Sequence, residues 1–111
     1  MHELSLLAGV VDTATAAAAG RPILAVNLTV GLMSGAVPDI LENCWPIARA
    51  GTPCANARLN LTVQPATVWC PSCAQEQPID EYFALTCPIC GTPTADQRHG
   101  REFQLTSIDV D

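Results

Sequence analysis

The sequence predicts an α+β protein in which two helices pack on a three-stranded sheet and a small cysteine-rich module interrupts the chain. Two observations support this fold class. Segments with apolar residues at helical spacing alternate with segments in which every second residue is apolar. Four cysteines occupy a separate stretch of prolines and short polar runs. We therefore expect a body made of residues 1–65 plus 100–111 and an inserted module made of residues 66–99.

The first expected element is a helix over residues 4–19, which Gly20 and Pro22 stop. Its apolar residues recur at helical spacing, at Leu4, Leu7, Val11, Ala14 and Ala18. Residues 23–31 follow as a strand, because apolar and polar residues alternate there. The apolar set of this strand is Leu24, Val26, Leu28 and Val30.

A turn over residues 31–35 leads to a second helix, which begins at Pro38 and ends near Gly51. Proline suits the first helical turn because the N–H that it lacks would have no helical partner there. One apolar face is expected, comprising Ile40, Leu41, Cys44, Trp45 and Ala48.

Two more strands complete the expected body. Residues 58–64 alternate in polarity, and Pro65 closes that strand. In the last strand, Phe103 and Leu105 have the opposite phase to Ile108 and Val110. A bulge near residues 106–107 would point all four side chains inward.

The charge balance disfavours a nucleic-acid or membrane role. Eleven acidic residues against five basic ones give a formal net charge of −6, which opposes binding to polyanions and anionic lipids. No segment reaches the roughly 20 apolar residues that a membrane span needs, and no signal-peptide pattern precedes the first helix. We expect a cytoplasmic protein, whose six cysteines are then metal ligands or thiols rather than disulfides.

Two C-x2-C units with thirteen residues between them predict a metal site of four thiolates in a zinc-ribbon-like module. The ligands are Cys70, Cys73, Cys87 and Cys90. A closed set of four thiolates indicates a structural ion rather than a catalytic one, and zinc is the expected occupant. Gly91 directly after the last ligand is suited to the positive φ of such a knuckle.

Two other chemistries compete for the same cysteines. Redox C-x2-C chemistry needs a single pair next to a helix N-terminus, whereas this chain has two matched pairs. Iron also binds four thiolates, and an electron carrier of the rubredoxin type would be coloured, whereas a zinc protein would not. The remaining cysteines receive no role: Cys44 is expected as an inert buried thiol of the second helix, and Cys54 is expected to be open to solvent in a loop after Pro53.

The first residues, Met1, His2 and Glu3, offer a second kind of metal chelate. The terminal amine, the His2 amide nitrogen and the His2 imidazole can close fused rings around an ion that prefers planar nitrogen donors, Ni(II) or Cu(II) rather than zinc. Glu3 could complete the set through its amide or its carboxylate. Taken alone this pattern is weak, because a histidine near a terminus is usually just solvated.

Several segments together resemble one family. They are MHELSL at the terminus, VGLMSGAVPD before the second helix, RAGTP after it, the spaced cysteine pairs, and the closing GREFQLTSIDVD. Along essentially the whole chain they resemble the HypA/HybF family of hydrogenase nickel-incorporation proteins. The resemblance implies a nickel metallochaperone, not an enzyme, with an α/β nickel-binding domain and an inserted zinc domain.

The resemblance also implies partners and ligands. A HypB-type GTPase would act with the chain to deliver Ni(II) to the large subunit of a [NiFe] hydrogenase, and in some organisms to urease maturation proteins. His2 and Glu3 match the family's N-terminal nickel-binding residues, and Asp39 matches an acidic position implicated in some members. Asp39 is equally explained as a carboxylate that the helix dipole favours. His99 follows the cysteine module without a clear motif and is expected to be exposed.

The chain departs from the family pattern at positions that bear on partner recognition. Leu32 replaces a usual glutamate, and Asn43 and Trp45 stand where phenylalanines are expected. One alternative class stays open, a zinc-ribbon adaptor that binds proteins or nucleic acid and transfers no nickel. Against nucleic acid, only Arg98 and Arg101 add positive charge near the module.

Overall fold

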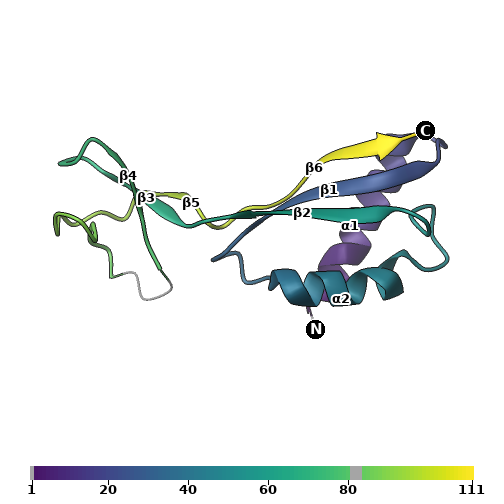
Figure 1. The fold of residues 1–111 in the computed structure, drawn as a ribbon, viewed down its shortest axis with the longest axis horizontal. Coiled ribbons are helices and arrows are strands. Elements are labelled where there is room, and N and C mark those ends of the chain that lie inside the picture. Colours follow the sequence, from purple (N-terminus) through teal and green to yellow (C-terminus); the bar gives the residue numbers. More distant parts are fainter. Residues whose placement is uncertain (1, 81–83) are drawn as a thin grey trace.

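The structure is a computed structural model that describes residues 2–80 and 84–111. The molecule is elongated, with principal extents of 51 × 26 × 15 Å, and two small sheets lie at its two ends (Figure 1). The larger sheet has the strand order β2-β1-β6 and the smaller one has the order β4-β3-β5. Their strands are β1 (Ile23–Gly31), β2 (Arg58–Gln64), β3 (Thr67–Cys70), β4 (Gln75–Pro78), β5 (Gln97–His99) and β6 (Phe103–Val110).

Two helices belong to the larger sheet. The first, α1 (His2–Ala18), packs against β1 and β6, and α2 (Pro38–Arg49) packs against β2 and α1 (Figure 1). The chain from β1 through α2 to β2 makes a parallel pair, while β6 returns antiparallel on the other side of β1. The three strands and two helices expected for the body are therefore all present. Neither helix is long and apolar enough to span a membrane, within the residues described.

The helix α1 begins two residues earlier than the sequence predicts. The expected start was residue 4, but the helix begins at His2 and so includes His2 and Glu3. It ends at Ala18, where Ala19 and Gly20 adopt φ values of 52° and 86°. The early start places the backbone N–H groups of His2 and Glu3 in the first helical turn, before the i→i−4 hydrogen bonds of the helix begin.

The bulge predicted in the last strand is confirmed. Asn27 pairs with Ser107 and Leu28 pairs with Leu105, so Thr106 is the extra residue of β6. The Thr106 hydroxyl donates to the Asn27 carbonyl at 3.0 Å. Because the bulge reverses the side-chain phase, all four expected apolar residues pack against the core: Phe103, Leu105, Ile108 and Val110.

Three positions assigned to the core are wrong. Leu24 is 45% exposed because β1 has its own register shift between Ile23 and Ala25, which buries Ile23 instead. Leu4 and Ile40 are also exposed, at 38% and 41%. Leu4 and Ile40 lie at the edge of the buried face of their helices, and this buried face is narrower than the sequence pattern predicts. The fully buried core side chains include Leu7, Leu28 and Leu41.

The two sheets are joined by a narrow neck, made of residues 31–33, 64–66 and 100–102, in which the end of β1 lies against the segments that leave and re-enter the larger sheet. The N–H of Gly31 donates to the Glu102 carbonyl at 2.6 Å, and the N–H of Met33 donates to the Gly100 carbonyl at 2.7 Å. A Cβ on Gly31 would run into the carbonyl group of Gly100. The neck therefore depends on close backbone contact. That the two sheets fold as separate domains stays a prediction.

Candidate metal sites

The four cysteines come together at the far end of the smaller sheet. Cys70 is the last residue of β3 and Cys73 lies in the turn that follows, whereas Cys87 and Cys90 come from a second loop. Their sulfur atoms all lie within 4.8 Å of one another. Among the residues described, this is the one group of three or more potential ligands gathered at a distance that suits a metal ion.

Each C-x2-C unit forms a knuckle in which backbone N–H groups face sulfur. The N–H of Cys73 donates to Cys70 Sγ at 3.3 Å, and the N–H of Ile89 donates to Cys87 Sγ at 3.4 Å. The residue directly after each unit has positive φ, 55° at Ala74 and 78° at Gly91. The positive φ expected at Gly91 is thus confirmed, and Ala74 adopts the same region at a steric cost.

Hydroxyl groups border the exposed side of the cysteine cluster. Thr92 Oγ1 lies 3.1 Å from Cys90 Sγ and forms a hydrogen bond of 2.9 Å with Ser72 Oγ, which joins the two knuckles. Hydrogen bonds from Thr92 lower the pKa of the Cys90 thiol to about 6. The hydrogen bond between Cys73 and Cys90 raises the pKa of the Cys73 thiol to about 12. Of these two thiols, Cys90 is therefore the one that loses its proton more readily. No motif in the sequence marks Thr92 or Ser72 as a partner of the cysteines.

The donor set fits zinc. Cys70 Sγ and Cys90 Sγ are 3.5 Å apart, close to the separation that two ligands need around a tetrahedral ion with Zn–S distances of about 2.3 Å. Cys70 and Cys87 are buried and four sulfurs leave no open coordination position. The ion would hold the two knuckles together and would offer no site for a substrate.

At the other end of the molecule, the Glu3 side chain links the start of α1 to the start of α2. Glu3 is 3% exposed, and its Oε2 accepts a hydrogen bond from the N–H of Val37 at 3.3 Å. Val37 is the residue that caps the N-terminus of α2. Hydrogen bonds from the Glu3 backbone N–H and from Val37 lower the pKa of this carboxyl, although burial opposes them. Glu3 is therefore an anion at neutral pH.

The His2 ring lies beside this carboxylate and is open to solvent. Its Nδ1 is 3.6 Å from Glu3 Oε1, and its side chain is 58% exposed. Asp39 lies exposed in the first turn of α2, two residues beyond Val37. The structure thus brings His2 and Glu3 together but does not gather Asp39 with them into a three-ligand group. Met1 lies outside the described residues.

The other predicted positions have mixed outcomes. Cys44 is partly buried against the core, whereas Cys54 is fully buried rather than open in a loop, and burial raises the pKa of its thiol. Trp45 is buried, and its Nε1 donates to the Ala57 carbonyl at 2.9 Å. Leu32 is 59% exposed at the turn after β1. His99 is exposed, as expected, but pairs with two glutamates.

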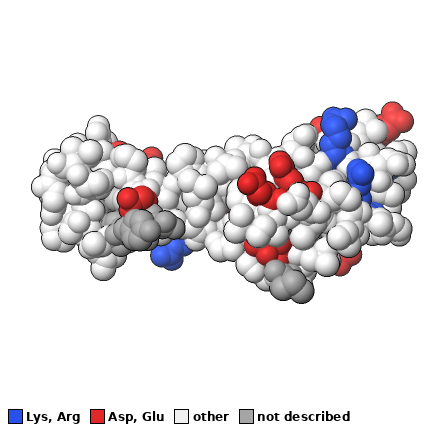
Figure 2. Space-filling view, turned by 60° about the horizontal axis from the view of Figure 1, so that its bottom comes forward, with Lys and Arg blue, Asp and Glu red and all other residues white. Residues whose placement is uncertain are grey.

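Acidic side chains dominate the visible charge on the side that carries α2. Figure 2 shows carboxylates gathered on the body and only separate basic side chains. This distribution agrees with the formal net charge of −6 and offers no continuous basic surface on that face.

The chain combines two features: an α+β body whose first helix begins with a histidine and a buried carboxylate, and a module built around four cysteines. These features are those of a small metal-binding protein. A family model described as "Hydrogenase/urease nickel incorporation, metallochaperone, hypA" matches residues 1–110. The chain belongs to the HypA family of nickel metallochaperones of hydrogenase maturation, and the resemblance seen in its sequence is confirmed.

Individual relatives agree with this assignment. The hydrogenase maturation factor HypA of Chloroflexus aggregans is 41% identical over 99% of both chains, and that of Geobacter metallireducens is 36% identical over the whole of both. Among solved structures, the Ni metallochaperone HypA from Helicobacter pylori matches with a TM-score of 0.67 at 18% identity, covering 99% of this chain and 97% of that one. Another HypA solution structure matches with a TM-score of 0.70, also at 18% identity, covering 99% and 96%. The structural matches confirm the α+β fold.

Proposed function

We propose that the chain binds Ni(II) at its N-terminus and delivers it for maturation of a [NiFe] hydrogenase. The proposed ligands are the α-amine of Met1, the amide and imidazole nitrogens of His2, and Glu3, with Asp39 as a further candidate. The observation that carries the proposal is the exposed His2 ring beside the buried Glu3 carboxylate. Nickel is the cargo, whereas zinc at the four cysteines is proposed to be structural.

The position of His2 at the first turn of α1 supports a nitrogen-rich chelate. The His2 N–H lies in the first turn of the helix, before the point where i→i−4 hydrogen bonds begin, so a deprotonated His2 amide would break no i→i−4 hydrogen bond. A planar set of nitrogen donors suits Ni(II) better than it suits zinc, because zinc prefers tetrahedral coordination. The ionised Glu3 carboxylate adds negative charge close to the ring and can orient it.

Delivery requires partners, which we propose from the family. Hydrogenase maturation implies contact with the maturation machinery, and a HypB-type GTPase and the hydrogenase large subunit are the proposed partners. Urease maturation proteins are proposed as a further partner in organisms that make urease. The exposed Leu32, where the family commonly has glutamate, would alter the surface offered to such a partner. We propose that delivery takes place in the cytoplasm.

Calorimetric nickel titration of the zinc-loaded chain tests the terminal chelate. Three forms are compared: the native chain, His2→Ala, and a form with two residues added before Met1, which converts the α-amine into an amide. Loss of a ligand should weaken nickel binding by at least about tenfold in both altered forms. Equal affinity in all three forms would show that the proposed ligands are wrong.

The titration should also depend on pH. An α-amine ordinarily titrates near 7.7–8.0 and an imidazole near 6.5, so protons compete with nickel over about pH 6–8. Affinity is therefore expected to fall as the pH is lowered through this range. In the extended form the amine no longer titrates, so the upper part of the pH dependence should disappear.

A further inference from the structure

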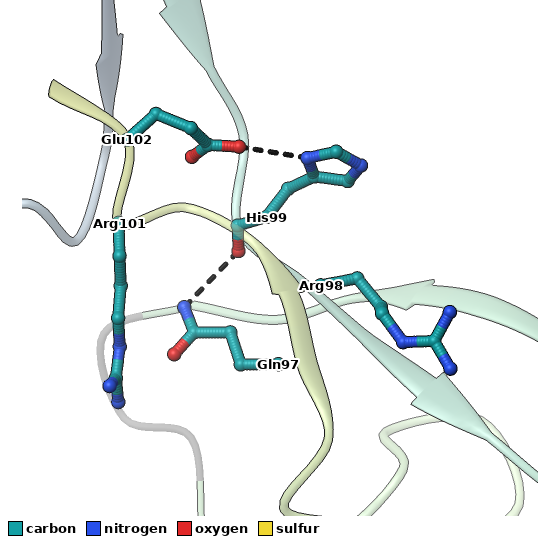
Figure 3. Close-up of a pocket in the computed structure, with 5 residues that line it drawn as sticks. All are labelled: Gln97, Arg98, His99, Arg101 and Glu102. Carbon is teal, nitrogen blue, oxygen red and sulfur yellow. Dashed lines mark hydrogen bonds and ion pairs between the residues drawn. The ribbon is translucent and has the colours of Figure 1, made fainter. Parts of the chain in front are cut away.

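A groove between α1 and β6 contains none of the proposed metal ligands. Its volume is about 430 Å³, and both of its walls are largely apolar. The residues that form it include Leu6, Gly9, Val10, Phe103 and Leu105. A hollow at the neck differs, because charged groups line it, and two of them, His99 and Glu102, already pair at 2.8 Å (Figure 3). The groove is therefore the hollow that suits an apolar ligand.

One wall of the groove is an edge strand of the larger sheet. Among the described strands, β6 pairs with β1 alone, so its other side has no strand partner (Figure 1). The N–H of Gly31 donates to the Glu102 carbonyl, and backbone direction alternates along an antiparallel strand. Phe103 and Leu105 therefore direct their N–H and C=O groups to the open edge. Their side chains pack on the helix side of the sheet, so the unpaired backbone adjoins the apolar groove.

The open edge beside the groove is short. The bulge at Thr106 interrupts the regular alternation after Leu105, so only residues 103–105 present a straight edge there. These three residues include no charged residue and no proline, both of which commonly keep an edge strand from adding another strand. A short extended segment can therefore pair with this edge, whereas a long strand would meet the bulge.

The polarity of β6 defines the segment that fits. On the open face of the sheet Gln104 is exposed, and Ser107 and Asp109 lie 3.0 and 3.5 Å from the Asn27 amide nitrogen. An added strand follows the same alternation, so every second side chain enters the groove and the others lie on this polar face. The formal net charge of −6 favours basic side chains at the polar positions.

A second copy of the chain fits this edge poorly. Two copies carry the same net charge of −6 and repel each other. Pairing β6 with a second β6 would also rest on the short edge of residues 103–105 alone. A partner segment with positive charge is attracted instead, and a short segment is enough to cover the edge.

We propose that β6 and the groove bind an extended segment of a partner protein in which apolar residues alternate with basic ones. The segment adds to β6 as an antiparallel strand, the pairing that is slightly more stable per residue. Its apolar residues stand opposite Phe103 and Leu105, exchange backbone hydrogen bonds with them and place their side chains against Leu6 and Val10. Gly9 leaves this space open, because nothing lies within 4 Å of a Cβ added there.

A synthetic peptide tests strand addition to the zinc-loaded, nickel-free chain. The probe is Lys-Val-Lys-Val-Lys-Val-Lys, capped at both ends. Calorimetry gives its affinity, and 15N chemical shifts should change at residues 6–13 and 103–105. N-methylation of the valine amides, which face β6 in the antiparallel pairing, should weaken binding by about tenfold or more. N-methylation of the lysine amides, which face solvent, should change the affinity by less than about twofold.

Two variants of α1 provide the matched comparison. Gly9→Leu places a side chain in the groove and raises the helix propensity, so the fold should be retained while the peptide affinity falls by about tenfold. Ala16→Leu adds similar bulk at an exposed position of α1 outside the groove, and it should bind the peptide like the native chain.

The proposal is wrong if the peptide shifts no resonance of residues 103–105, or if the two N-methylated peptides bind alike. Unchanged affinity in Gly9→Leu, or equal affinity for a peptide with glutamate in place of lysine, would also contradict it. A free chain that sediments as a dimer, and as a monomer in Gly9→Leu, would assign the groove to a second copy instead.

Discussion

At the scale of single residues, Glu3 does two things at once. Its carboxylate accepts a hydrogen bond from Val37, thirty-four residues along the chain, and it lies beside the His2 ring. A buried carboxylate needs such donors, because an unpaired charge would be expensive to desolvate. The same residue therefore holds α1 against α2 and places negative charge next to the proposed nickel site.

Replacing Glu3 with glutamine separates these two contributions. The amide oxygen of Glu3→Gln can still accept from Val37, so the fold should be retained, but the charge beside His2 is lost. We expect nickel affinity, measured by calorimetry, to fall by about tenfold. Glu42→Gln, on an exposed position of α2, is the matched control and should bind nickel like the native chain. Unchanged affinity in Glu3→Gln would remove Glu3 from the proposed site.

At the scale of elements, the sequence predicts a shift in strand register where the alternation of apolar and polar residues clearly changes phase. The Thr106 bulge was predictable because apolar residues switch phase between Leu105 and Ile108. The bulge at Leu24 was not, because Ile23 and Leu24 are both apolar and either can be buried. The predicted burial of Leu4 and Ile40 was wrong for a similar reason. Both residues continue the apolar pattern of their helix, but they lie beyond the part of the helix that packs against a neighbour.

The candidate sites divide in the same way. The four cysteines were predictable because their ligand spacing is local and each knuckle forms its own turn. Two other contacts join segments that are distant in the sequence, Glu3 with Val37 and His99 with Glu76. No local sequence pattern predicts such contacts. Burial of Cys54 was missed because its loop is covered by the core.

Close backbone contact at the neck makes a sharp stability prediction. Gly31→Ala should lower the free energy of unfolding by about 3 kcal/mol, because the added methyl would collide with the backbone of Gly100 in the neck. Gly9→Ala is the control, since nothing lies within 4 Å of its added Cβ on α1, and it should stabilise by about 0.5–1 kcal/mol. Urea denaturation measures both, and a Gly31→Ala chain as stable as the native one would show that the neck tolerates separation.

At the scale of the whole molecule, the cysteine cluster and the proposed nickel site lie in different parts of an elongated chain, and we propose different tasks for them. The cysteine cluster is closed by two knuckles and bordered by hydroxyls, which suits an ion that stays. The N-terminal site has an exposed ring and few fixed ligands, which suits an ion that must leave. The neck joins the two parts through backbone hydrogen bonds, and Gln97 of β5 adds a side-chain contact to Met33, with 3.6 Å between Nε2 and Sδ.

Zinc removal should therefore affect the two parts unequally. Without the ion, the loops that carry the cysteines have little apolar core to hold them, whereas α1, α2 and the larger sheet keep theirs. Hydrogen exchange after chelation should show lost protection at the knuckles and retained protection in β1. Cys73→Ser should lower the zinc content in the same way, while Cys44→Ser should not. Equal loss of protection in both parts would mean that zinc stabilises the body as well.

The central claim is that nickel binds at the N-terminus and not at the four cysteines. X-ray absorption at the nickel edge of the zinc-loaded chain, with one nickel added, tests it most directly. Nickel at the N-terminus should show nitrogen and oxygen scatterers only, with the pre-edge signature of a planar site, and this spectrum should be lost in His2→Ala. Sulfur scatterers around nickel, or the same spectrum in His2→Ala, would contradict it.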